Sequence, residues 1–540
     1  MDDQTIFNNK NQGQNNPPSE GATSRITAQD LYGPSGVVNT DVQNQQISQT
    51  STVSTETLNK PEPLSPPVQP LSAPVENMNT FSEVEPLTGS MPPSGINSYL
   101  KNKKILAAAI VFIVLILIIF IGILSRLFGG GGNRGITNAT LTYWGLWEES
   151  KTMQSTVGEF QKKYPGIKIN YIKQDPQKYK ERLITRIKNN TEAPDIFSFH
   201  NSWVSTLTSS SDNVLLPLPQ EVIKPDEFQK IYYPVILRDM SKNGAIYGLP
   251  QGVDVLALFI NKDIFDAAGV KVPKTWEEFN TIVRQLTVKE KNGIIQTSGV
   301  ALGTFDNVTH APDIVSLIMA TNGIDLSSLE KQPEFVKESL LHYTSFAKGE
   351  EGVWSNSLGS SRDMFAQGKA AMYFGYSWDI FAIQAISKDL NFSVHPVPYL
   401  PTGSGSQTKI TIASYWANGL STQTKHQKEA LLFIKFLSEK ETMQKIFTEA
   451  SKSRLFGMPY PRRDMASMLA DDPILYPFVE QASNATSTIF SSDTNDTLYN
   501  SLLNDYLGNA VREIYAGGSV DTATKTFLQG INQVQTQSLQ

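Results

Sequence analysis

The chain of 540 residues contains no cysteine. Without thiols it has no disulfide bond, no zinc site built on thiolates and no nucleophilic cysteine. It also lacks the N-terminal cysteine that is acylated in many tethered bacterial exported proteins. If this protein is held at a membrane, another segment of the chain has to hold it.

Histidine is scarce as well, and the short motifs of common enzyme classes are missing. The five histidines are isolated from one another, and no H-E-x-x-H, G-x-S-x-G or Walker sequence occurs. We therefore predict no metal and no cofactor, and these absences argue against an enzyme. A pair of glycosidase carboxylates stays open as an alternative, because their separation of about 5–10 Å is set by tertiary structure.

Residues 1–100 lack tryptophan and have few cations. They hold ten acidic residues against three basic ones, and stretches such as "NNKNQGQNNPPSEG" are rich in Asn, Gln, Pro and Ser. Such a segment buries too little apolar surface to offset the entropy lost on ordering. We predict a disordered tail over residues 1–100, which serves as a spacer or, through "PLSP", as a docking peptide.

One long hydrophobic run follows this tail. Residues 105–124 are twenty consecutive positions without a charge, which is about 30 Å of helix and enough to cross a bilayer. The run is too long, and starts too late, for a cleaved signal peptide. We predict a transmembrane helix within residues 101–128 that contacts the lipid bilayer through residues 105–124, followed by a Gly-rich linker over 129–136.

The charges that flank this run predict its orientation. Lys101, Lys103 and Lys104 precede it, whereas Arg126 and Arg134 follow it. An excess of cations marks the cytoplasmic side. We therefore expect a single-pass protein of the cell membrane with a cytoplasmic N-terminus and an extracellular or periplasmic C-terminal part.

The C-terminal part is about 400 residues long, which is more than one hydrophobic core usually supports, so we expect two lobes. The total charge of −6, less −7 in the tail and +5 in residues 101–137, leaves −4 for this part. This mildly acidic balance gives no indication of nucleic acid as a partner.

Patterns of strand and helix alternate at the start of the C-terminal part. "ATLTYWG", "IKINY" and "APDIF" have the composition of strands, and between them Met153, Val157 and Phe160, then Leu183 and Ile187, recur at helical spacing. Strands that alternate with helices predict an α/β fold with a mainly parallel sheet. Ligands of such sheets bind beyond the carboxyl ends of the strands.

Several longer motifs resemble those of one family. They are "LTYWGLWEES", "GAIYGLPQGVDVLALFINKDIFDAAGVKVPKTWEEF", "FAQGKAAMYFGYSW" and "SRLFGMPYPRRD", and together they resemble extracellular solute-binding proteins of the maltose-binding type. The resemblance implies a type II periplasmic-binding-protein fold, with lobe 1 at 137–253 and 418–460 and lobe 2 at 254–417 and 461–540. It places the crossing strands near 252–258 and 410–419 and after 457–461.

The same resemblance implies a function. Such proteins capture a small polar ligand, here a sugar or oligosaccharide in the first place, by hinge closure and deliver it to ABC permease subunits. The domain would be monomeric. The lobes do not reproduce the sugar-contacting pattern of the maltose binder, so maltose is not implied. A ligand-binding sensor domain of a membrane receptor is the alternative.

The candidate ligand-binding residues lie near the predicted strand ends and crossings. Aromatic faces cover the apolar face of a sugar ring, while amides and carboxylates bind its hydroxyls. The candidates are Trp147, Glu148, His200, Asn201, Trp203, Asp254, Tyr376, Trp378, Tyr415 and Trp416.

Each candidate also has a structural alternative. The tryptophans could pack in the core, Asp254 could be a capping carboxylate, and His200 could cap the helix that follows it. We expect Trp378 and Asp254 to clamp the ligand together, with Asp254 near the cleft floor. Trp276 is not a candidate, because it lies inside a T-x-x-E capping box and should pack locally.

Overall fold

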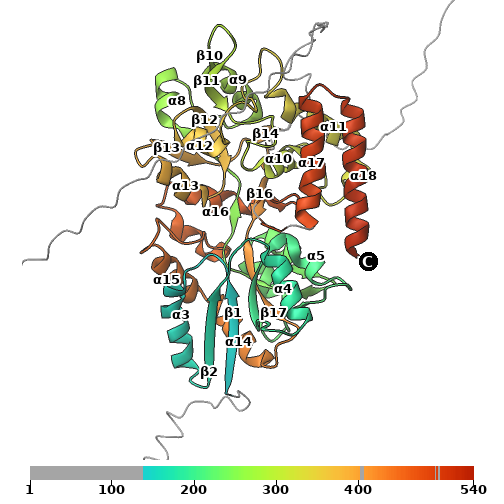
Figure 1. The fold of residues 1–540 in the computed structure, drawn as a ribbon. Helices are drawn as coiled ribbons and strands as arrows, with labels where there is room; N and C mark the ends of the chain where they lie inside the picture. The colour runs from blue at the N-terminus through green and yellow to red at the C-terminus, as the bar shows by residue number, and fades with distance from the viewer. Residues whose placement is uncertain (1–137, 402–406, 493, 497–498, 540) are drawn as a thin grey trace, which may run out of the picture. The chain divides into compact units, whose positions relative to one another are not determined.

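The computed structural model describes residues 138–401, 407–492, 494–496 and 499–539 (Figure 1). The predicted tail, the predicted membrane span at residues 105–124 and the Gly-rich linker lie outside these residues. Within the part that the structure describes, no helix combines the length and the apolar composition that crossing a membrane requires.

The first lobe is built on a six-stranded sheet. Its strands β1, β2 and β3 are parallel, and β17 pairs antiparallel with β3, β4 and β7. The strands are β1 (Ala139–Gly145), β2 (Ile167–Lys173), β3 (Ile196–His200), β4 (Leu215–Leu216), β7 (Leu249–Pro250) and β17 (Trp416–Ser421). The predicted alternation of strand and helix at the start of this part is confirmed.

Short helices flank this sheet. They are α3 (Ser150–Lys163), α4 (Tyr179–Lys188), α5 (Val204–Leu207), α6 (Pro225–Ile231), α7 (Pro234–Met240), α14 (Gln427–Leu437) and α15 (Lys440–Ala450). A further helix, α16 (Tyr476–Gln481), contacts the first crossing at Asp254–Val255. In Figure 1, α3 and α15 lie beside the β2 edge, and the two helices contact each other. A two-stranded hairpin of β5 (Ser241–Lys242) and β6 (Ala245–Ile246) follows α7.

The second lobe is built on a five-stranded sheet in the order β10-β11-β12-β9-β13. Its strands are β9 (Ala257–Asn261), β10 (Val288–Lys289), β11 (Ile295–Val300), β12 (Ala370–Gly375) and β13 (Phe392–His395). β14 (Leu400–Pro401) and β15 (Gln407–Thr408) form a separate hairpin.

The helices of the second lobe include the two longest near the C-terminus. They are α8 (Lys262–Ala268), α9 (Trp276–Leu286), α10 (Ala311–Thr321), α11 (Pro333–Ser345), α12 (Ser361–Ala366), α13 (Asp379–Ile386), α17 (Tyr499–Tyr515) and α18 (Val520–Leu539). Figure 1 shows α17 and α18 side by side, and both contact α11.

A three-stranded sheet joins the lobes. It consists of β8 (Asp254–Val255), β16 (Thr411–Ser414) and β18 (Ala485–Ser487), in the order β18-β16-β8. β8 and β16 lie within the two crossings predicted at 252–258 and 410–419. The third strand comes well beyond residues 457–461, which instead run beside the first crossing, where Val253 N–H donates to the Pro459 carbonyl.

The hydrophobic core continues from one lobe to the other through the first crossing. Val255, Ala257 and Phe259 belong to a cluster that includes the first-lobe core and one side of the second-lobe sheet, where Phe259 meets Phe365 and Tyr373 edge to face. Leu256, Leu258 and Ile260 belong to the cluster on the other side of that sheet. This division follows from the period of two in a strand, because alternate side chains point to opposite faces. β9 is therefore buried on both faces.

The capping box at the start of α9 is present as predicted. Thr275 accepts a hydrogen bond from the Glu278 backbone N–H, and the Glu278 carboxylate accepts one from Thr275 N–H. Trp276, directly after the cap, is 1% exposed and stacks on Phe374. Trp276 also meets Phe279 of the same helix edge to face, with ring centroids 5.2 Å apart, which confirms its local packing.

Candidate binding site

A cavity of about 330 Å³ lies where the hinge strands meet both lobes. Segments from six parts of the chain supply its walls: the loop after β1, the first crossing, the start of α13, the junction of β16 and β17, the loop after α15, and Asn495 shortly before α17. The lining residues are Trp147, Gly252, Val253, Asp254, Ser377, Trp378, Phe381, Ser414, Tyr415, Trp416, Arg454, Phe456, Gly457, Met458, Pro459 and Asn495.

Three tryptophans from separate elements face this cavity. Trp147 and Trp416 meet edge to face, with ring centroids 5.4 Å apart, on the side of the first lobe. Trp378, from the second lobe, is held by an offset stack on Tyr376 with ring centroids 4.4 Å apart. Trp147 and Trp378 are only half-buried. Each therefore keeps part of its apolar surface available to a ligand.

Asp254 lines the cavity, but its carboxylate is engaged by the protein. Oδ2 accepts hydrogen bonds from the backbone N–H of Ser377 at 3.0 Å and from the Ser377 hydroxyl, and Oδ1 accepts one from Val255 N–H at 2.9 Å. Burial raises the pKa of Asp254 to about 8. Asp254 thus ties the first crossing to the start of α13 and fixes the position of the neighbouring Trp378.

An ion pair borders the same cavity. Arg454 Nη2 lies 2.5 Å from Glu148 Oε1, and Arg454 Nε donates to the Phe456 carbonyl at 2.8 Å. The guanidinium is also 5.7 Å from the centre of the Phe381 ring on α13. Burial raises the pKa of Glu148, and Arg454 opposes this shift. Glu148 therefore holds Arg454 in place and does not itself line the cavity.

Three of the predicted site residues lie behind the cavity wall. His200 caps the short helix after β3 by accepting from Ser202 N–H, and its Nε2 is 3.0 Å from Ser414 Oγ. Burial lowers the pKa of His200 to about 3, so the ring is neutral. Asn201 donates to Asp239. Trp203 is fully buried, with its ring centroid 5.2 Å from that of Trp416.

The two predicted tyrosines also support the wall through hydrogen bonds. Tyr376, fully buried beneath Trp378, donates its hydroxyl to Asp313 Oδ1 at 2.9 Å. Tyr415 lines the cavity and donates its hydroxyl to Asp239 Oδ2 at 2.8 Å. Both hydroxyls are therefore occupied by carboxylates of the protein.

The structure brings together Trp147, Asp254, Trp378, Tyr415 and Trp416 of the predicted set. Sequence reasoning missed Ser377, Phe381, Arg454, Phe456, Met458 and Asn495. The motif "SRLFGMPYP" contains three of these, but no local spacing marks them, because their partners lie far away in the sequence. Arg454 and Glu148, for example, are 306 positions apart.

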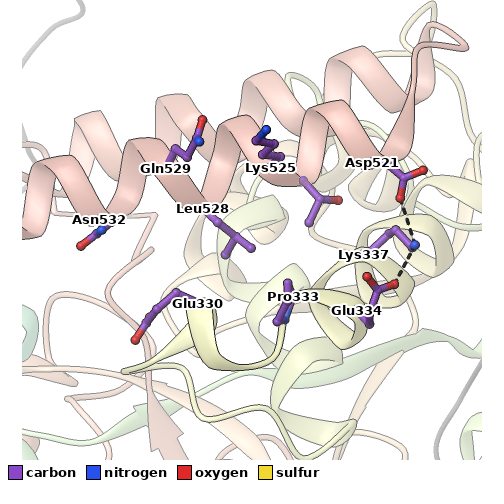
Figure 2. Close-up of a pocket in the computed structure, with 10 residues that line it drawn as sticks. Glu330, Pro333, Glu334, Lys337, Asp521, Lys525, Leu528, Gln529 and Asn532 are labelled. Atoms are coloured by element: carbon purple, nitrogen blue, oxygen red, sulfur yellow. Dashed lines mark hydrogen bonds and ion pairs between the residues drawn. The ribbon is translucent and has the colours of Figure 1, made fainter.

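A second groove, of about 390 Å³, lies between α11 and α18 (Figure 2). Lys337 crosses it to form ion pairs with Glu334 at 2.7 Å and Asp521 at 3.0 Å. None of its ten lining residues is aromatic, and none belongs to the hinge strands. Although it is larger, we do not assign the ligand to it. Among the described residues, no cluster of His, Asp and Glu is arranged to ligate a metal ion.

Comparisons with known proteins identify the family of the chain. The family model described as bacterial extracellular solute-binding protein matches residues 144–444, which is more than half of the chain. The multiple sugar-binding protein of Streptococcus mutans is 27% identical over 218 residues, or 38% of this chain and 50% of that protein. The galactooligosaccharide-binding protein of Bacillus subtilis is 22% identical over 312 residues, which cover 54% of this chain and 68% of that protein. The chain therefore spans half to two thirds of these relatives.

Solved structures show the same fold. A cyclo/maltodextrin-binding protein in complex with maltotetraose matches with a TM-score of 0.59 at 19% identity, over 74% of this chain and 98% of that one. The GacH receptor of Streptomyces glaucescens, solved unliganded and with acarbose, matches with a TM-score of 0.56 at 21% identity, over 73% of this chain and 98% of that one.

Proposed function

This chain belongs to the family of bacterial extracellular solute-binding proteins, and we propose that its hinge cavity captures a small carbohydrate by closure of the two lobes. The family and its relatives are binding proteins rather than enzymes. The observation that carries the proposal is the arrangement of Trp147, Trp378 and Trp416 around one cavity between the lobes. The sugar-binding relatives and the saccharide-bound structures support the ligand class.

The chemistry of the walls suits an uncharged saccharide. Indole faces bury the C–H surfaces of a pyranose ring, whereas Arg454 and Asn495 supply hydrogen-bonding groups for its hydroxyls. The charge of Arg454 is balanced by Glu148. A volume of about 330 Å³ falls at the small end of ordinary ligand pockets. A mono- or disaccharide unit fits this description.

We further propose that the two lobes are residues 137–253 with 418–460, and 254–417 with 461–540. The transmembrane helix would keep the extracellular or periplasmic domain beside an ABC permease, to which the ligand is delivered. This tether would replace the acylated cysteine that the chain lacks.

Calorimetric titration of the protein with a panel of neutral mono- and oligosaccharides tests the ligand class. We expect at least one to bind with one-to-one stoichiometry and to emerge uncleaved. Binding of amino acids or peptides alone would contradict the carbohydrate assignment, and release of shorter sugars would indicate an enzyme.

Deletion of residues 1–100 separates transport from signalling. A transporter component that keeps its membrane helix should retain uptake, because all the described residues that line the cavity lie beyond this tail. Loss of a transcriptional response with uptake intact would instead support the receptor alternative.

A further inference from the structure

One end of the first lobe carries a concentration of unpaired lysines. β1, β2 and β3 begin at this end and β17 terminates there, since β17 is antiparallel to β3. We call it the basal edge, and define it by the turns at residues 162–168, 189–195 and 422–428. α14, which follows the last of these turns, contacts both β1 and β17.

Four exposed lysines lie in the turns of the basal edge. Lys162 lies in the last turn of α3, Lys168 is the second residue of β2, and Lys425 and Lys428 flank the start of α14. Among the described residues, none of the four forms an ion pair. The charge is therefore available to an external partner.

The neighbouring carboxylates are already engaged. Glu439 pairs with Lys163, Glu192 with Arg186 and Asp212 with Lys188. Asp195 accepts hydrogen bonds from Thr142 N–H and from the Thr424 hydroxyl, Glu159 pairs with Lys445, and Glu429 is buried. The net charge of this part of the chain is −4, so its positive and negative charges are concentrated on different surfaces. A surface with unpaired positive charge favours an anionic partner.

The short chain between this edge and the predicted membrane span indicates that the nearest anionic surface is the membrane itself. The span ends at residue 124 and β1 begins at Ala139, so residues 125–138 connect them. A Gly-rich chain of 14 residues has a root-mean-square length of roughly 20 Å and reaches at most about 50 Å. If residues 105–124 span the membrane as proposed, this length would keep the strand end that carries the lysines near the bilayer surface.

We propose that the basal edge docks on anionic lipid headgroups of the membrane that anchors the chain. This inference rests on the proposed anchoring and is independent of the ligand. Electrostatic docking of this kind needs no structured pocket, because several lysines near an anionic surface act together. Docking would orient the lobe relative to the membrane and restrict the directions in which the ligand cavity faces.

The absence of cysteine makes a direct test simple. A fluorescent donor is placed on Gln427→Cys, an exposed position between Lys425 and Lys428, and the full chain is reconstituted into vesicles with an acceptor on a few lipid headgroups. Energy transfer is compared between phosphatidylcholine vesicles and vesicles that also contain phosphatidylglycerol. We expect stronger transfer with phosphatidylglycerol, and a loss of this difference at 1 M salt, where the screening length falls to about 3 Å.

Two charge-matched variants complete the design. In the first, Lys162, Lys168, Lys425 and Lys428 are changed to Gln, and the ratio of docked to undocked protein should fall by about fivefold for each lysine removed. In the second, four exposed lysines of the second lobe are changed to Gln, and the ratio should stay unchanged; these are Lys271, Lys274, Lys291 and Lys388.

Several outcomes would overturn the inference. Equal energy transfer in both kinds of vesicle would show that the basal edge does not bind anionic lipid, as expected if its partner is a protein. An equal loss of docking in the two variants would show that the four basal lysines have no special role. Release of the chain from vesicles by alkaline carbonate would overturn the anchoring and the docking together. Carbohydrate binding, measured on the same samples by tryptophan fluorescence, would be unaffected in each case.

Discussion

Replacing Trp378 by alanine is expected to weaken ligand binding while leaving the fold largely intact. The side chain is half-buried, lines the hinge cavity and contacts the core through its stack on Tyr376. His310 also meets the indole edge to face, with ring centroids 6.4 Å apart, and the rest of the exposed part of the side chain is open to the cavity. The substitution therefore removes a ligand contact and only part of a protein contact.

The magnitudes follow from these contacts. Stacking and area burial against a sugar ring are worth about 1.5–3 kcal/mol, so the dissociation constant should rise roughly ten- to a hundredfold. Loss of the stack on Tyr376 should cost about 0.5–1.5 kcal/mol of the free energy of unfolding. A fully buried tryptophan replaced by alanine would cost about 3–5 kcal/mol.

Trp354 provides the matched control. It is 1% exposed, and its Nε1 donates to Asn307 Oδ1 at 3.1 Å, away from the cavity. Trp354→Ala should lower stability by the full amount for a buried tryptophan and leave the affinity of the folded protein unchanged. Calorimetry gives the affinities, and urea unfolding followed by circular dichroism gives the stabilities.

One result would refute the reasoning. If Trp378→Ala kept the affinity of the unmodified protein but lost as much stability as Trp354→Ala, Trp378 would be a packing residue. The cavity would then bind its ligand through other groups, or would not be the binding site.

Three further predictions concern titratable groups that are buried, or that pair with a buried group. The pKa of Asp254 is raised to about 8, so the folded protein keeps a proton on this carboxyl that the unfolded chain releases. The free energy of unfolding should therefore fall as the pH rises from about 4 to 8. Asp254→Asn should flatten this fall in urea titrations, and an unchanged pH dependence would contradict the prediction. Burial lowers the pKa of His342 to about 4, so the free energy of unfolding should decrease as the pH falls from about 6.5 to 4. His342→Phe should reduce that decrease by up to about 3 kcal/mol. The same pH dependence of stability in the variant would contradict the prediction. Arg454→Met leaves the buried Glu148 unpaired and should cost about 1–3 kcal/mol, most of which Glu148→Gln should restore; a double-mutant cycle without coupling would contradict this.

The elements that local patterns determine were predicted well. The first strands and helices follow from the alternation and helical spacing of their apolar residues, and the capping box at Thr275 depends on only four consecutive residues. In contrast, β18 is a three-residue strand, "ATS", that forms only because β16 lies beside it. Its position could not be read from periodicity.

The candidate site was predicted in part, for a related reason. Trp203 and Trp378 both lie near predicted strand ends, yet one is fully buried and the other half-buried. The difference arises because Trp416 on β17 covers Trp203, and that contact depends on a strand more than 200 positions away. Arg454 and Phe456 lie on a loop that reaches the cavity only in the folded protein.

Small-angle X-ray scattering of residues 138–540 with and without saccharide tests the central claim most directly. If a carbohydrate bound in the hinge cavity closes the two lobes, the radius of gyration should decrease at saturating ligand. The same measurement on Trp378→Ala should require a roughly ten- to hundredfold higher ligand concentration for the same decrease. An unchanged scattering profile with a saccharide that calorimetry shows to be bound would contradict capture by closure.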